Sequence, residues 1–249
     1  MKHKASLAAL APLTLGACAA LFGSSSPFAF DKKGDLVEFN YSWSAEASRT
    51  PSLVRRLQGD LERAFKAAVA TAEADRAQSA AMKRPFNGHQ YSRRWTSAGQ
   101  SPRLLSLDGR LMLSTGGAQP SHGADGLLWD RLTGTEVKID RLFGASTALE
   151  KLVHSSFCVT LDGERAKRRG AQMRPGDAFS ECPRLDAIAV FPADSNANRR
   201  FDRFRLIAPN GVAGAYVEGR YDVAVPVTAA MLAALRPAYR SSFEVNQPQ

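Results

Sequence analysis

The sequence predicts an α+β fold in which an antiparallel sheet meander packs against one long N-terminal helix and two shorter helices. Apolar residues recur every three or four positions over residues 50–82, which is the period of a helix. Short strand-like segments separated by turns fill residues 87–143. Strands and helices do not alternate regularly along the chain, and this disfavours a doubly wound parallel sheet.

The first part of the predicted domain contains one strand and then the long helix. Hydrophobic and polar residues alternate over 37–43, which indicates a half-buried strand. In the helix over 50–82, Thr50 is the expected N-cap and Pro51 the first helical residue. The apolar stripe of this helix should face the core, and it consists of Leu53, Leu57, Leu61, Phe65 and Ala68.

The middle of the chain predicts five short strands with Asp-Gly and Thr-Gly pairs as the turns between them. These strands are expected at 89–99, 102–109, 110–117, 126–134 and 135–143.

The last third of the chain predicts a helix at 146–161, followed by a polar loop at 162–184. The dense basic run at 164–174 within this loop should be solvated. Three further strands and a final helix, opened by Thr228 and stopped at Pro237, are expected at 185–194, 201–209, 216–227 and 228–239.

The N-terminus has the pattern of a cleaved secretory signal peptide over residues 1–17, with a basic start and a short apolar run. Its end, "LGAC", resembles a bacterial lipobox and predicts lipid on Cys18. The alternative is an ordinary signal peptide in which Cys18 is incidental. We expect residues 18–35 to form a lipidated tether and residues 36–245 to form the folded domain.

Lipidation would place the protein in the cell envelope, with the lipid bilayer as its partner through acylated Cys18. In lipoprotein sorting, an aspartate after the cysteine tends to retain a protein at the inner membrane. Ala19 occupies that position here. In a cell with two membranes, we therefore expect the outer membrane, with the domain facing the periplasm.

The chain has three cysteines, and an odd number outside the cytoplasm needs an explanation. If Cys18 carries lipid, Cys158 and Cys182 remain as a pair, and an oxidising compartment favours a disulfide between them. Two free thiols are the alternative. Neither cysteine belongs to a CxxC pair, which disfavours redox catalysis and thiolate metal sites.

The chain is basic, with a formal net charge of +9 at pH 7. Removal of Lys2 and Lys4 with the signal peptide would lower this charge to +7. An exported basic protein favours anionic wall polymers or lipid headgroups as partners, and the compartment argues against nucleic acid.

Two segments resemble the RsiV-like extracellular domain, and the resemblance extends over about residues 36–240. The first segment carries a "tGGAHP"-like loop and an ending close to "l.dLF", through Thr115, Gly116, Gly117, Ala118, Pro120, Thr133, Gly134, Leu142 and Phe143. The second resembles the closing "laPY..G.Y.v.iP" pattern, through Ala208, Pro209, Gly214, Tyr216 and Pro226. The chain departs from the first motif at Gln119, where the family has a histidine; His122 follows three residues later.

The resemblance implies an envelope-facing module without a cofactor, which binds a cell-envelope component. That component is expected to be a glycan such as peptidoglycan, or an envelope protein. Related domains lie beside polysaccharide deacetylase modules in PdaC-type enzymes. A cell-wall polysaccharide hydrolase or deacetylase, or an accessory subunit of one, is therefore the alternative function.

The loop of the first motif is the candidate binding loop, with Gly116, Gly117, Gln119, Pro120 and His122 as its residues. The two glycines would permit positive φ or close backbone approach, and the proline would rigidify the return. Ser114, Ser121, His122 and Asp125 lie close together in sequence, but triad members usually come from distant segments. A structural turn or a binding surface is therefore favoured over a catalytic site.

A second polar loop has the spacing of a calcium site, with Asp194, Asn196, Asn198 and Asp202 at its first, third, fifth and ninth positions. Arg199 stands where glycine is wanted, and Arg205 where a bidentate glutamate is wanted. Three arginines in or near the loop also raise the local positive charge. These departures favour a polar turn between strands, and no metal is expected.

Overall fold

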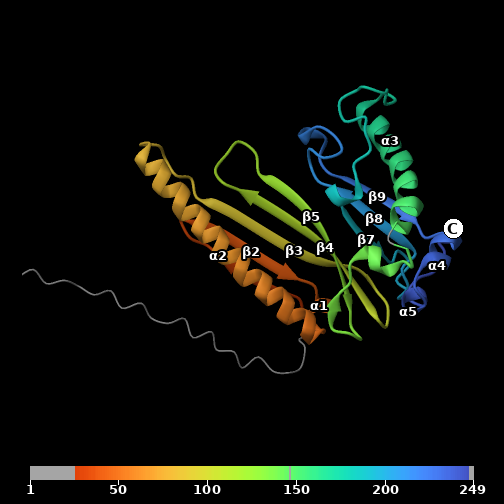
Figure 1. Cartoon of the computed structure of the whole chain (residues 1–249). Helices are drawn as coiled ribbons and strands as arrows, with labels where there is room; N and C mark the ends of the chain where they lie inside the picture. Colours follow the sequence, from red (N-terminus) through yellow and green to blue (C-terminus); the bar gives the residue numbers. More distant parts are fainter. Residues whose placement is uncertain (1–25, 146, 247–249) are drawn as a thin grey trace, which may run out of the picture.

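The computed structural model describes residues 26–145 and 147–246. The signal peptide, Cys18 and the first part of the expected tether lie outside these residues. The described chain forms two sheets, with α2 (Pro51–Ala81) alongside the larger one and α3 (Ser155–Arg169) packed against the smaller one (Figure 1). The fold is α+β with mostly antiparallel strands, as the sequence predicts.

The larger sheet has six strands, which are neighbours in the order of the sequence. They are β1 (Phe28–Lys32), β2 (Val37–Trp43), β3 (His89–Gln100), β4 (Leu104–Ser114), β5 (Ser121–Asp130) and β6 (Thr135–Glu136). All neighbours are antiparallel except β2 and β3, which run parallel. Strands β3 to β6 thus form the antiparallel meander expected over residues 87–143, and β2 joins it by a parallel pairing. The long α2 connects β2 to β3 and returns the chain to the end from which β2 started.

Strand β1 was not expected, because its residues fall within the predicted tether. It pairs with β2 in antiparallel register. The ring of Phe28 stacks on Trp43 with centroids 3.7 Å apart, and Phe30 contacts the ring of Phe65 on α2. The folded domain thus includes residues 28–32 and does not begin at 36 as predicted.

Helix α2 covers one face of the larger sheet. Thr50 is its N-cap residue and Pro51 lies in its first turn, as predicted, although the Thr50 side chain makes no capping hydrogen bond. Leu53 and Leu57 are fully buried against the alternating residues of β2. The same core contains the inward-facing residues of β3, β4 and β5, namely Trp95, Leu105, Leu107, Leu127 and Trp129.

The predicted Asp-Gly turns are wrong. Asp108 and Gly109 lie inside β4, so the two strands expected at 102–109 and 110–117 are one. A Cβ atom on Gly109 would lie 2.4 Å from the Trp95 ring, and one on Gly126 would lie 2.8 Å from Phe191. These two glycines permit close approach rather than a turn. The Thr-Gly pair does form a turn, at Gly134 with φ +67°.

The smaller sheet contains the three predicted C-terminal strands, β7 (Ala189–Ala193), β8 (Arg203–Ala208) and β9 (Tyr221–Pro226). Strand β7 packs on β3, β4 and β5 over the face of the larger sheet that α2 does not cover. A second and larger core lies between this sheet, α3 and the C-terminal segments.

The helix predicted at 146–161 begins later and extends further along the chain than predicted. A π-helical turn at Glu150–His154 leads into it, and it continues through part of the expected polar loop to Arg169. Gly170, with φ +69°, ends it.

The final helix is divided in two. Thr228 caps α4 (Ala229–Ala234), and Pro237 begins the short α5 (Pro237–Arg240). Within the part of the chain that the structure describes, no helix is long and apolar enough to cross a membrane.

Candidate functional site

The candidate binding loop joins β4 to β5 and is tied down by a distant residue. The hydroxyl of Tyr216 donates a hydrogen bond to the carbonyl of Pro120, and its ring lies 6.3 Å from that of His122. The two segments that carry the family resemblance therefore meet at this contact. Gln119 is exposed.

The two glycines of this loop differ in what they do. Gly116 has φ +81°, which only glycine adopts without strain. Gly117 does not have a positive φ, and among the described residues no atom would lie within 4 Å of a Cβ atom at this position. The expectation of positive φ or close approach is therefore correct for Gly116 and wrong for Gly117.

The polar residues near the loop do not converge. His122 and Asp125 are separated by three positions on β5, so their side chains project from opposite faces of the sheet. Asp125 forms a 2.6 Å ion pair with Arg93 on the face that α2 covers. The loop is thus a docked turn, and these two residues do not form an acid–base pair.

The predicted disulfide is present between Cys158 on α3 and Cys182, with Cα atoms 5.5 Å apart. It ties the helix to the loop at 170–184, within the segment that was expected to be a polar loop. Closing this loop restricts the unfolded chain and contributes about 3 kcal/mol on the chain-entropy model. His154 lies 3.7 Å from the Cys158 sulfur. Among the described residues, these three form the only His, Cys, Asp or Glu group close enough to hold a metal, and the disulfide occupies both sulfurs.

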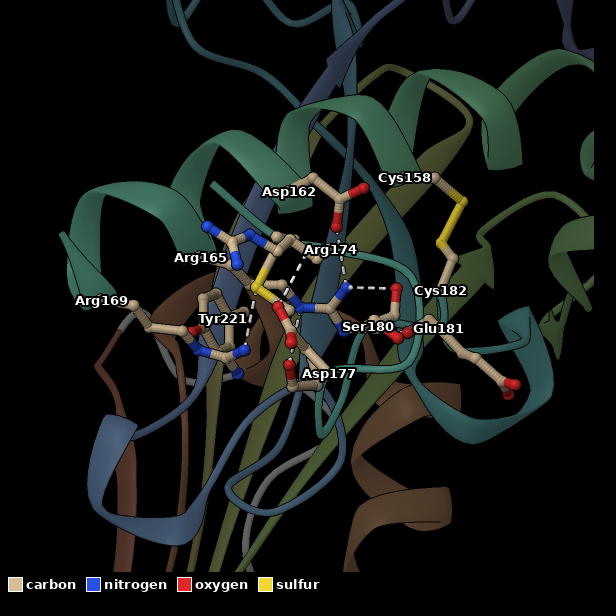
Figure 2. A network of polar contacts seen from close by, with 12 residues as sticks. Cys158, Asp162, Arg165, Arg169, Arg174, Asp177, Ser180, Glu181, Cys182 and Tyr221 are labelled. Carbon is tan, nitrogen blue, oxygen red and sulfur yellow. Dashed lines mark hydrogen bonds and ion pairs between the residues drawn. A yellow bond between two sulfur atoms is a disulfide. The ribbon is translucent and has the colours of Figure 1, made fainter. Parts of the chain in front are cut away.

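A buried arginine holds the same loop from within (Figure 2). Arg165 is fully buried, and its guanidinium donates to the carbonyls of Ala213 at 2.8 Å and Glu181 at 3.0 Å. It also pairs with Asp162 at 2.9 Å. The sequence places Arg165 in a basic run that was expected to be solvated, and this expectation is wrong for Arg165. The spacing of Asp162 and Arg165 on one helix face was the available signal.

A polar cavity of about 1120 Å³ lies where the loop at 194–203 meets the C-terminal segment at 244–246. Its apolar lining consists of Leu232 and Val245. The remaining lining residues carry hydroxyl, amide, carboxylate or guanidinium groups, and they are Ser195, Asn196, Asn198, Arg200, Asp202, Arg203, Glu244 and Asn246. Three of the four residues of the calcium-type spacing therefore line this cavity.

The loop has the backbone of a calcium loop. Asp194 Oδ2 accepts a hydrogen bond from Arg199 N at 2.9 Å, and Asn196 Oδ1 accepts one from Asn198 N at 3.1 Å. Arg199 has φ +68°, so it makes the sharp turn for which the calcium loop uses glycine.

The charges around this loop differ from those of a calcium site. Asp202 is buried and pairs with Arg203 at 3.1 Å. Burial alone would raise the pKa of Asp202, but hydrogen bonds from Arg203 and Ser195 hold this pKa below its ordinary value. Glu244 lies 4.0 Å from Arg200. Arg203 thus already compensates Asp202, Arg200 lies beside Glu244, and the Asp194 carboxylate is used by the backbone N–H groups of the loop, which favours a polar turn.

Glu244 and Asn246 belong to the cavity but were not predicted as site residues. Glu244 Oε1 accepts hydrogen bonds from the side-chain amides of Asn196 at 2.9 Å and Asn198 at 2.7 Å. Asn246 donates to Asp202 at 2.7 Å. The sequence carries no local signal for these contacts, because more than forty residues separate the partners.

We expect millimolar calcium to leave the thermal midpoint of unfolding unchanged, because the Asp194 carboxylate accepts backbone hydrogen bonds within the loop and the Asp202 carboxylate is paired with Arg203. Differential scanning calorimetry with calcium, and with excess chelator, measures this. A calcium-dependent rise in the midpoint that Asp194→Ala abolishes would contradict the polar-turn interpretation.

No protein-family model and no curated protein sequence matches the chain. Two solved structures of the DUF3298 family share its fold. The one from Bacteroides fragilis NCTC 9343 has 10% sequence identity and a TM-score of 0.52, and the match covers 87% of this chain and 95% of that one. The one from Pseudomonas aeruginosa PAO1 has 16% identity and a TM-score of 0.50, with coverage of 85% and 94%. The chain therefore has, over most of its length, the fold of these DUF3298 structures.

Proposed function

We propose that the protein is a lipid-anchored envelope protein whose domain is RsiV-like and binds a wall glycan without chemical turnover. The polar cavity carries this proposal. Its amide, carboxylate and guanidinium groups offer both donors and acceptors, which is what a ligand rich in hydroxyl groups requires. An envelope protein is the other expected class of ligand. The small apolar share of the lining makes the glycan the better fit.

Two further observations support the RsiV-like part of the proposal. The fold agrees with two DUF3298 structures over most of the chain. The two segments that resemble the family lie far apart in sequence, yet they meet through Tyr216 and Pro120. A shared contact between separate motifs is expected if both belong to one structural unit.

Binding to isolated peptidoglycan sacculi tests the proposed function. We expect the protein to sediment with sacculi and to release no soluble product. Combined Asn196→Ala and Glu244→Ala substitutions should weaken retention about tenfold, which corresponds to about 1.4 kcal/mol of lost hydrogen bonding. Gln58→Ala combined with Glu62→Ala is the matched control, because it removes one amide and one carboxylate from the exposed side of α2, and it should bind normally.

Release of muropeptides or of acetate would favour the alternative function, a polysaccharide hydrolase or deacetylase. Equal retention of the cavity variant and the Gln58→Ala/Glu62→Ala control would remove the cavity from the proposal. Failure of the unaltered protein to sediment with sacculi would contradict glycan binding altogether.

The membrane anchor is the second part of the proposal. Two or three acyl chains on Cys18 exceed the number needed for stable attachment to a bilayer. We expect Cys18→Ser to release the protein from the membrane fraction with an unchanged circular dichroism spectrum, because Cys18 precedes the first strand of the domain. Membrane attachment that persists in the Ser variant, or unaltered protein that incorporates no labelled palmitate, would refute the lipobox prediction.

A further inference from the structure

Two arginines stand side by side on the face of the larger sheet that α2 does not cover. Arg94 on β3 and Arg110 on β4 are register partners, so their side chains project from the same face as direct neighbours. Both are exposed. Like charges that lie directly opposite each other destabilise a strand pair, and this pair therefore costs stability.

The surrounding residues do not compensate this charge. Among residues 26–145 and 147–246, Arg94 makes no side-chain hydrogen bond or ion pair. Arg110 lies 3.5 Å from one carboxylate, that of Asp108. The same Asp108 oxygen lies 3.3 Å from Arg205, so two guanidiniums share it.

The charge continues onto the smaller sheet. Arg205 on β8 also pairs with Asp222 on β9, and Arg220 lies 3.4 Å from the same Asp222 carboxylate. This row of charges contains four guanidinium groups and only two carboxylates. The guanidiniums belong to Arg94, Arg110, Arg205 and Arg220, and the carboxylates to Asp108 and Asp222. The positive charge that the two carboxylates do not compensate lies at the end of this row, where Arg94 and Arg110 are exposed.

The neighbours of the two arginines on this face include Ala124 and Met112 on the side of β4 and β5, and polar side chains on the side of β2 and β3. Ser42 on β2 is the register partner of Arg94, and the adjacent row contains Asn40 and Ser92, which are partners of each other. Their hydroxyl and amide groups offer further hydrogen bonds beside the guanidiniums. Because the residues lie on the inner strands β2, β3 and β4, the sheet fixes their spacing.

We propose that Arg94 and Arg110 bind carboxylate groups of the short acidic peptides attached to the wall glycan. This inference rests on the proposed function and adds the peptide to the recognised ligand. Guanidinium groups bind carboxylates in a bidentate manner, and a fixed pair suits such groups on a polymer. Arg94 lies five residues from Gly99 on the same strand, roughly 16 Å at the rise of a β-strand. The neighbouring Ala98 carbonyl accepts a hydrogen bond from Asp194 N at 3.0 Å, so this strand leads from the arginine pair to the loop that borders the polar cavity.

The test compares Arg94→Gln/Arg110→Gln with the matched control Arg55→Gln/Arg141→Gln. The control removes the same charge from two exposed arginines whose side chains also have no partner among the described residues. Full-length protein in detergent is titrated with muropeptides and with the same muropeptides after amidation of their carboxylates. We expect the Arg94/Arg110 variant to bind native muropeptides at least about tenfold more weakly than the control. The unaltered protein should bind the amidated muropeptides more weakly than the native ones by a similar factor.

Each other outcome overturns the inference. Equal affinity of the two variants, or no effect of amidation, would remove the arginine pair from the site while leaving glycan binding through the cavity intact. Selective loss of binding to vesicles with anionic headgroups, with muropeptide binding unchanged, would assign the pair to a membrane surface instead. Failure of the unaltered protein to bind sacculi or muropeptides would reject both this inference and the proposed function.

Discussion

The ion pair between Asp108 and Arg205 is the contact on which the relation between the two sheets depends. Asp108 is almost completely buried on β4, and one of its oxygens has no hydrogen-bond partner among the described residues. Arg205 reaches it from β8. Burial alone would lower the pKa of Arg205, but the carboxylates of Asp222 and Asp108 raise it. Arg110 lies 3.5 Å from the same carboxylate but belongs to β4, so Arg205 is the cation that this buried group receives from the smaller sheet, and its removal leaves the carboxylate less compensated.

The glycines of the larger sheet permit this arrangement. A side chain at Gly126 would collide with Phe191 and the Val190 carbonyl, and one at Gly99 would collide with Asp194. Because glycine has no side chain, β7 can approach the larger sheet at Gly126. For the same reason, the loop at 194–203 can lie beside the end of β3 at Gly99. The polar cavity and the exposed arginine pair both border this junction, so the geometry of both candidate sites follows from the packing of the two sheets.

The sequence predicted those elements whose signal is local. The alternation of 37–43, the helical period after Thr50 and the cysteine count identified β2, α2 and the disulfide. The Asp-Gly pairs were misinterpreted, because glycine is equally suited to a turn and to close packing, and only the neighbour across the sheet distinguishes the two. The candidate sites likewise depend in part on contacts that the local sequence does not reveal. The loop residues of the cavity were visible from their spacing, whereas Glu244 and the neighbours Arg94 and Arg110 depend on tertiary contacts and strand register.

A double-mutant cycle of Asp108→Asn and Arg205→Gln tests most directly whether this ion pair fixes the two sheets. The free energies of unfolding are measured by chemical denaturation for the four proteins, with Asp222→Asn and Arg205→Gln as the more exposed control pair. The account predicts a coupling energy of about 2 kcal/mol for the buried pair, and at most about 1 kcal/mol for the control. Additivity of the Asp108 and Arg205 effects within about 0.5 kcal/mol would show that the sheets are held independently of this contact and would contradict the account.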